Sequence, residues 1–277
     1  MVDCQKIAQE IKDKCKEELK SLNSKFYLKI IQVEGDIASN AYTKGKKKDC
    51  EEIGLSCQHV LLPNNCSVGD VRDEISKGNT DNLCVGIILQ LPLPQHLKQH
   101  EEHLVNCINP AKDVDGFIEE SPFDPCTPAG IIHIAKEHWG SLEGKTVTVI
   151  GRGKLVGAPL VKLLNKENAT IIQCNSHTSK ATLRNVCAIS YVVVTATGCI
   201  NTLSADMVSA ISSATLVIDA GINRDEDGKL CGDCDKRLYK WHENITPVPG
   251  GVGLITRAML MKNCVEAAKR KKVYLFE

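Results

Sequence analysis

The sequence predicts an α/β fold of two domains, each with helices packed on a parallel sheet. Three observations predict it. Strand-like apolar runs alternate with helix-like segments along most of the chain, which is typical of βαβ units. This alternation breaks once, in the proline-rich and acidic stretch at 112–128, and then begins again. The 277 residues, 43% hydrophobic and 25% charged, are enough for two globular domains. We expect a cleft between the domains to hold the active site.

The first half of the chain opens with a charged amphipathic segment at 1–20, which predicts a helix and lacks the apolar stretch of a signal peptide. Strands are predicted at 27–33, 56–63 and 83–94. Helices are predicted around 42–50, from Ser67 as the N-cap, and from about 96 to 106.

In the second half, a helix is predicted near 129–138 and strands at 145–151, 170–174, 189–198 and 215–223. We assign residues 1–118 and a C-terminal helix, about 254–277, to the first domain. Residues 119–253 form the second.

Charge and cysteine content narrow the class of protein. Thirty-four basic and 34 acidic side chains cancel, so no overall field favours nucleic acid or a membrane surface, and no apolar run has the length of a membrane span. The 14 cysteines are scattered, and only Cys231 and Cys234 form a close pair, so a zinc ribbon lacks its second pair. We expect reduced thiols and a cytoplasmic protein.

The stretch KTVTVIGRGKLVGAPLVKLL at 145–164 predicts a buried strand, a glycine-rich turn and a helix, the Rossmann-like arrangement that binds a dinucleotide. The spacing Gly151-x-Gly153-x-x-x-Gly157 is one residue longer than usual. On spacing alone, an ordinary strand-to-helix turn is about as plausible a reading.

The cofactor type is indicated by the next strand, which ends at Cys174 and is followed by Asn-Ser-His-Thr. An NAD enzyme usually has a carboxylate there for the ribose hydroxyl. Its absence, together with Arg152 and Ser176, favours the 2′-phosphate of NADP.

The stretch ASNAYTKGKKKDCEE at 38–52 holds Tyr42 followed by Lys44, Lys46, Lys47 and Lys48. A run of lysines usually forms a solvated helix face. At about 100° per residue, however, only Lys46 shares a helix face with Tyr42. Lys46 is therefore the candidate functional lysine.

Several longer motifs occur in a fixed order. After the Tyr42-x-x-x-Lys46 pair come ILQLPLP (88–94), KDVDGF (112–117), PCTP (125–128), Gly151-Arg152 and TPVPGGVG (246–253). In these motifs, and over nearly its whole length, the chain closely resembles the bifunctional methylenetetrahydrofolate dehydrogenase/methenyltetrahydrofolate cyclohydrolase family.

The resemblance implies an NADP-dependent oxidation of 5,10-methylenetetrahydrofolate, followed by hydrolysis of the methenyl product to 10-formyltetrahydrofolate. It places the chain in one-carbon metabolism as a homodimer, with the first domain catalytic and folate-binding and the second NADP-binding. Lys46 would be the catalytic base or proton shuttle. Tyr42 would pack on the folate, Gln90 would bond to Lys46, and Asp115 would hold the pterin.

The resemblance also implies binding residues, with no metal. The expected folate contacts are Tyr42, Leu89, Gln90, Leu91, Asp115, Pro249, Gly250, Gly251 and Val252. The expected cofactor contacts are Thr127, Gly151, Arg152, Gly153, Val156, Gly157, Ser176, His177, Thr197, Gly198 and Ile222.

The chain departs from the family pattern at three places. Gly153 stands where the family usually has Ser, and Leu254 where it usually has Pro. The segment at 118–125 is shorter than the family's.

Two alternative functions stay open. One is a dehydrogenase without cyclohydrolase activity. The other is a metal- or redox-responsive binding protein built on Cys231 and Cys234 with His96, His100 and His103, which would share one side of the predicted helix. A short-chain dehydrogenase also has Tyr-x-x-x-Lys, but after its glycine loop, whereas here the pair comes first.

Overall fold

A computed structural model describes residues 1–22, 25–35 and 37–276. Contacts divide the chain into two units. The three-stranded unit comprises Gln9–Cys126 and Arg257–Glu277, and the four-stranded unit comprises Met1–Ala8 and Thr127–Thr256. Relative to the predicted division, residues 119–126 group with the three-stranded unit, and residues 1–8 and 254–256 group with the four-stranded unit.

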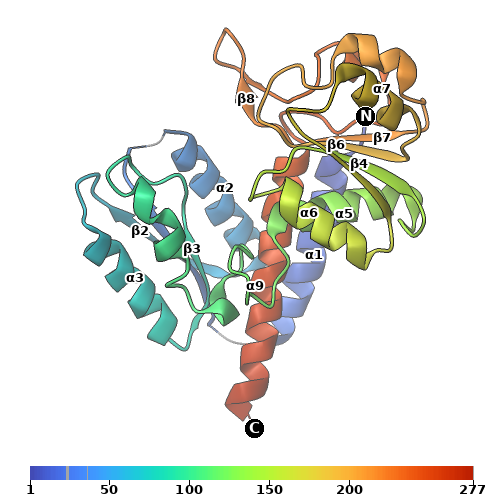
Figure 1. The fold of residues 1–277 in the computed structure, drawn as a ribbon. Helices are drawn as coiled ribbons and strands as arrows, with labels where there is room; N and C mark the ends of the chain where they lie inside the picture. The colour runs from blue at the N-terminus through green and yellow to red at the C-terminus, as the bar shows by residue number, and fades with distance from the viewer. Residues whose placement is uncertain (23–24, 36, 277) are drawn as a thin grey trace. The chain divides into compact units, whose positions relative to one another are not determined.

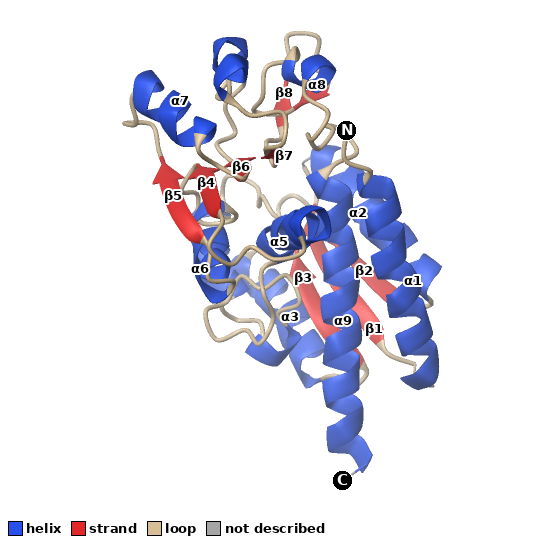
Figure 2. Ribbon diagram, turned by 90° about the vertical axis from the view of Figure 1, so that its right-hand side faces the viewer, coloured by secondary structure: helices blue, strands red, loops and turns tan. Residues whose placement is uncertain are grey.

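The sheet of the three-stranded unit is parallel, with strand order β2-β1-β3. Its strands are β1 (Tyr27–Val33), β2 (Ser56–Leu62) and β3 (Cys84–Leu89). The helical segments are α1 (Cys4–Leu22), α2 (Ile37–Ile53), α3 (Val68–Thr80), η1 (Lys98–His100), α4 (Glu101–Val105), η2 (Pro110–Lys112) and α9 (Val252–Phe276). Helix α3 lies on one face of the sheet, and α2 and the part of α9 after Arg257 lie on the other (Figures 1 and 2). The central strand β1 is apolar at most positions because both of its faces are covered.

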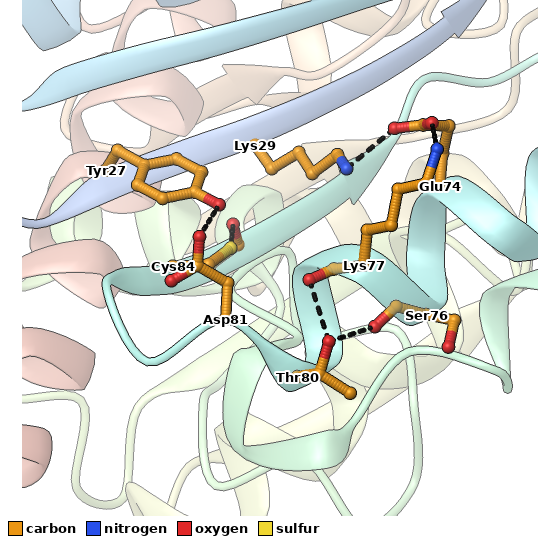
Figure 3. Close-up of polar contacts among 9 residues, drawn as sticks. Tyr27, Lys29, Glu74, Ser76, Lys77, Thr80, Asp81 and Cys84 are labelled. Atoms are coloured by element: carbon orange, nitrogen blue, oxygen red, sulfur yellow. Dashed lines mark hydrogen bonds and ion pairs between the residues drawn. The ribbon is translucent and has the colours of Figure 1, made fainter.

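Polar contacts attach α3 to β1 (Figure 3). The Lys29 ammonium of β1, which is 2% exposed, pairs with the Glu74 carboxylate of α3 at 2.8 Å. The Tyr27 hydroxyl donates to the Asp81 carboxylate just after α3 at 2.7 Å. At the other end of α3, Ser67 and Asp70 form a capping box, which confirms the predicted N-cap.

The predicted helix at 96–106 is wrong in extent. The chain forms the short 3₁₀ turn η1 and then the five-residue α4. His96 precedes both, and its ring hydrogen-bonds the carbonyl of Cys66 at 3.0 Å. The three histidines therefore do not share one α-helix: His96 precedes the helical residues, His100 lies in the 3₁₀ turn and His103 in α4.

The four-stranded unit is Rossmann-like: a parallel sheet of order β5-β4-β6-β7. Its strands are β4 (Thr146–Ile150), β5 (Thr170–Cys174), β6 (Val192–Thr195) and β7 (Leu216–Asp219). The other elements are α5 (Cys126–Trp139), α6 (Gly157–Lys166), α7 (Lys180–Ala188), η3 (Ala205–Ala210), the hairpin β8 (Asn223–Arg224) and β9 (Leu230–Cys231), and α8 (Leu238–Trp241). Helices α5 and α6 cover one face of the sheet and α7 the other (Figure 1). Residues of β4, β6, β7 and α7 form its apolar core.

All 14 cysteines are free thiols, as predicted. Cys84 and Cys187 are completely buried, where a thiol packs as a small apolar group. Within the described part of the chain, no helix is long and apolar enough to cross a bilayer.

Candidate active site

Helix α2 brings Tyr42 and Lys46 together, one turn apart. The Lys46 ammonium lies over the Tyr42 ring, 5.0 Å from its centroid. Lys46 is 4% exposed, whereas Lys44 and Lys48 are exposed and Lys47 is half-buried. Lys46 is thus the buried lysine of this run, and burying an ammonium costs free energy unless polar or charged partners surround it.

Two side chains from other elements provide those partners. Gln90 follows the end of β3, and its Oε1 accepts a hydrogen bond from Lys46 Nζ at 3.2 Å. Asp115 comes from the loop after η2, and its Oδ2 lies 3.9 Å from Lys46 Nζ. The Gln90 amide donates in turn to the carbonyl of Leu91 at 2.8 Å, which orients its oxygen toward the lysine. A helix, a strand end and a loop thus meet at one ammonium.

The loop that carries Asp115 is held by its own backbone and by α9. The buried Asp113 carboxylate accepts the backbone N–H of Ile118 at 2.8 Å. Gly116 has φ +74°, and a Cβ there would come within 2.7 Å of later backbone, so this position requires glycine. Asn263 of α9 donates to the carbonyl of Val114 at 2.9 Å. Asp115 therefore stands on an ordered loop.

Burial shapes the electrostatics of these groups. It raises the pKa of Asp113 to about 6, with Asp115 adding to the effect. Burial and then the Asp115 carboxylate raise the pKa of Tyr42 well above its usual value. The Tyr42 phenol is therefore a neutral hydrogen-bond donor at physiological pH.

Sequence reasoning missed Arg257, which packs against α2 at Gly45 and Asp49. Its Nε is 3.0 Å from the Asp49 carboxylate. A Cβ at Gly45 would lie 1.7 Å from the Arg257 guanidinium, so Gly45 makes room for it. No local signal links positions more than 200 residues apart.

The glycine turn of the four-stranded unit requires glycine at two of its three positions. Gly151 has φ +123°, and a Cβ there would meet the Ala196 carbonyl oxygen at 2.2 Å. A Cβ at Gly157 would meet the Gly151 oxygen at 2.4 Å. Gly153 has open space around it among the described residues. Val156 offers no side-chain cap to α6. The Ala158 N–H instead donates to the carbonyl of Gly153 at 3.1 Å, and Pro159 has no N–H.

The other expected cofactor residues lie in the four-stranded unit. Arg152, Ser176 and His177 are exposed beside this turn, and no carboxylate follows β5. Ala196, against which Gly151 packs, is followed directly by Thr197 and Gly198. Ile222 is 72% exposed after β7. The Thr127 hydroxyl lies 3.1 Å from that of Thr256. The expected folate residues Pro249, Gly250, Gly251 and Val252 lead into α9.

The alternative metal site would use Cys231 and Cys234 with His96, His100 and His103. Among residues 1–22, 25–35 and 37–276, no group of three or more His, Cys, Asp or Glu side chains is arranged to hold a metal ion. Cys231 and Cys234 are buried free thiols.

The fold and these two sets of residues define a two-unit α/β enzyme with a dinucleotide-binding sheet and a buried lysine centre. Residues 2–115 match the model of the tetrahydrofolate dehydrogenase/cyclohydrolase catalytic domain, and residues 125–272 match that of the NAD(P)-binding domain of the same family. The chain belongs to the tetrahydrofolate dehydrogenase/cyclohydrolase family.

Relatives match over nearly the full length. The bifunctional protein FolD of Agathobacter rectalis is 40% identical over 283 residues, which cover 98% of this chain and 99% of the relative. The crystal structure of the bifunctional enzyme FolD from Campylobacter jejuni has a TM-score of 0.87 and 36% identity, covering 97% and 98% of the two chains. The Trypanosoma brucei FolD structure, complexed with NADP cofactor and inhibitor, has a TM-score of 0.86 and 28% identity, covering 98% and 97%.

Proposed function

We propose that this chain oxidises 5,10-methylenetetrahydrofolate with NADP and hydrolyses the methenyl product to 10-formyltetrahydrofolate. Family membership gives the two activities. The observation that carries the residue assignment is the buried ammonium of Lys46, with Gln90 at 3.2 Å, Asp115 at 3.9 Å and the Tyr42 ring at 5.0 Å.

The folate is held by groups whose chemistry suits a pterin. The Asp115 carboxylate accepts hydrogen bonds from adjacent N–H groups of the ring, a bidentate arrangement that fixes its orientation. The face of Tyr42 packs on the flat part of the substrate, and Leu89 and Leu91 provide apolar contact on either side of Gln90. Pro249, Gly250, Gly251 and Val252 complete the folate contacts.

Lys46 moves a proton in the hydrolysis. Water attacks the methenyl carbon, and a proton leaves that water as the new C–O bond forms. When the ring then opens, the departing nitrogen needs a proton. Lys46, acting as the neutral amine, takes the proton of the attacking water, and the ammonium so formed gives it to the departing nitrogen. The remaining hydroxyl proton leaves to solvent as the formyl C=O forms, and the Gln90 oxygen holds Nζ in place for both transfers.

The four-stranded unit binds the cofactor. The glycine turn from Gly151 to Gly157, with the Gly157 N–H at the start of α6, receives the pyrophosphate. Arg152 and Ser176 bind the 2′-phosphate, which makes NADP the cofactor rather than NAD. When bound, NADP accepts the hydride of the substrate's methylene carbon. Gly153, Val156, His177, Thr197, Gly198, Thr127 and Ile222 supply the remaining contacts.

The wider assignments follow from the family and from the thiols. The three-stranded unit is the catalytic domain and the four-stranded unit the NADP-binding domain. Fourteen free cysteines support a reducing compartment, the cytoplasm. The family resemblance supports a homodimer, and sedimentation equilibrium at micromolar concentration measures it directly.

Both activities are measured on one purified preparation. Methenyl hydrolysis is followed without nucleotide, and methylene oxidation is followed with NADP and with NAD. We expect both reactions, with NADP preferred. Oxidation without hydrolysis would instead make the chain a dehydrogenase alone. Loss of both on chelation, together with stoichiometric bound metal, would favour the metal-binding alternative.

A further inference from the structure

A buried carboxylate in the four-stranded unit lies at the centre of the expected cofactor residues. Asp233 is 0% exposed and lies in the Cys231-Gly-Asp-Cys234 segment after β9. Its Oδ2 accepts the Thr197 backbone N–H at 2.6 Å and the Thr197 hydroxyl at 2.9 Å. The same oxygen accepts the Gly198 N–H at 3.3 Å. A buried charge is tolerated only when its oxygens are satisfied in this way.

The other oxygen of Asp233 reaches a second loop. Its Oδ1 accepts the Asn223 side-chain amide at 2.8 Å, and that amide also donates to the carbonyl of Gly232 at 3.1 Å. Asn223 directly follows Ile222. One side chain thus joins the loop after β6, which holds Thr197, to the turn after β7, which holds Ile222.

A second buried carboxylate orients Asp233 itself. Asp219, at the end of β7, is 1% exposed. It accepts the backbone N–H groups of Asp233 at 3.0 Å and of Cys234 at 2.8 Å. The Tyr239 hydroxyl donates to it at 2.6 Å. A Cβ at Gly221 would lie 2.2 Å from Asp233 Oδ1, so the turn after β7 can approach this closely only with glycine there.

From this geometry we infer that Asp233 is a positioning residue for the nicotinamide dinucleotide. It fixes the loop of Thr197 and the turn of Ile222 relative to one another on the binding surface. The inference rests on the cofactor residues of the proposed function. The carboxylate suits this task because it accepts four donors and donates none. An amide in its place would direct its NH₂ group at one of those donors.

The test is Asp233→Asn, measured by NADP binding in calorimetry and by both activities. The NH₂ group of the asparagine in this variant, facing one of these donors, leaves both groups unpaired, which costs free energy. We therefore expect the Kd for NADP to rise about 10- to 100-fold. The KM for NADP should rise with it. Methenyl hydrolysis, measured without nucleotide, should stay within about twofold, and so should the KM for folate.

Two further variants separate positioning from general stability. Asp227→Asn changes an exposed carboxylate in the β8–β9 hairpin, and NADP binding should stay at the wild-type level. Tyr239→Phe removes one donor from Asp219 and leaves its backbone donors, so the Kd for NADP should rise by less than in Asp233→Asn. If Asp233→Asn does not fold, Tyr239→Phe tests the positioning role in its place, by its increase in the Kd for NADP.

Hydrogen exchange in the protein without NADP gives a readout independent of the cofactor. The amides of Thr197, Gly198 and Asn223 should exchange faster in Asp233→Asn, and those of β1 should not. Unchanged exchange at these amides, or an unchanged Kd for NADP, would overturn the positioning role. Equal loss of hydrolysis and binding would make Asp233 a stability residue only. Wild-type protein that binds no NADP would refute the proposed cofactor, and this inference with it.

Discussion

Replacing Lys46 with Met tests the centre of the proposed site. Methionine keeps the length and apolar stem of the side chain and removes the ammonium. Gln90 Oε1 then loses its donor at 3.2 Å and Asp115 its cation at 3.9 Å. Without the proton-carrying group, methenyl hydrolysis should fall by a factor of about 100 or more. Hydride transfer depends mainly on how the two ligands are positioned, so oxidation should fall less.

Stability should fall in Lys46→Met. Two charges about 4 Å apart attract by about 4 kcal/mol at an effective dielectric constant of 20. Removing the ammonium ends its burial cost, but it leaves Asp115 and Gln90 without their partner, so the free energy of unfolding should fall by up to about 3 kcal/mol. Circular dichroism should show a folded protein with a Tm below that of wild type.

The matched controls are Lys44→Met, Lys47→Met and Lys48→Met on the same helix. Lys44 and Lys48 are exposed and Lys47 is half-buried, so each should keep hydrolysis within a few-fold of wild type. Hydrolysis and NADPH formation are measured separately for all four variants. Normal hydrolysis in Lys46→Met, or an equal loss in Lys44→Met, would refute the assignment.

Three more substitutions test the cofactor turn and the Asp115 loop. Arg152→Ala should raise the KM for NADP far more than that for NAD, since a charge-assisted contact contributes about 1.5–3 kcal/mol. Equal increases in the two KM values would refute the assignment of Arg152 to the 2′-phosphate. Gly153→Ser fits the open space at this position and adds a hydroxyl, so the Kd for NADP in calorimetry should fall by up to about tenfold; weaker binding would contradict this. The pKa of Asp113 rises on folding from 3.8 to about 6, so its contribution to stability is complete below about pH 4 and is lost as the pH rises through 6. In urea unfolding, the free energy of unfolding of wild type should fall by roughly 3 kcal/mol relative to that of Asp113→Asn between about pH 4 and 7. The same pH dependence of this free energy in both proteins would contradict the raised pKa.

Local pattern predicted most elements of the fold. Strand β1 was predicted with its observed bounds, and Ser67 caps α3 as expected, because burial periodicity and capping depend on neighbouring residues. The helix predicted at 96–106 was wrong in extent, because the spacing of apolar residues does not determine where a helix begins or whether its first turn is 3₁₀. Helix α2, at Ile37–Ile53, is also longer than the helix predicted around 42–50.

The candidate site also has features that the sequence predicted and features that depend on the tertiary structure. The sequence alone determined that Lys46 shares a helix face with Tyr42, and that a glycine turn follows a buried strand, since both depend on a few consecutive residues. The resemblance to the family supplied Gln90 and Asp115 as candidates. Only the tertiary structure decided their distances to Lys46.

The tertiary structure alone also revealed Arg257 over Gly45, and Asp233 joining the loops of Thr197 and Asn223. Sequence spacing describes which side chains share a face of one element. Contacts between elements depend on how the whole chain packs, and a buried carboxylate is recognisable as a bridge only when the donors around it are known. The sequence therefore determined most elements and one candidate catalytic face, and packing decided which distant residues hold them in place.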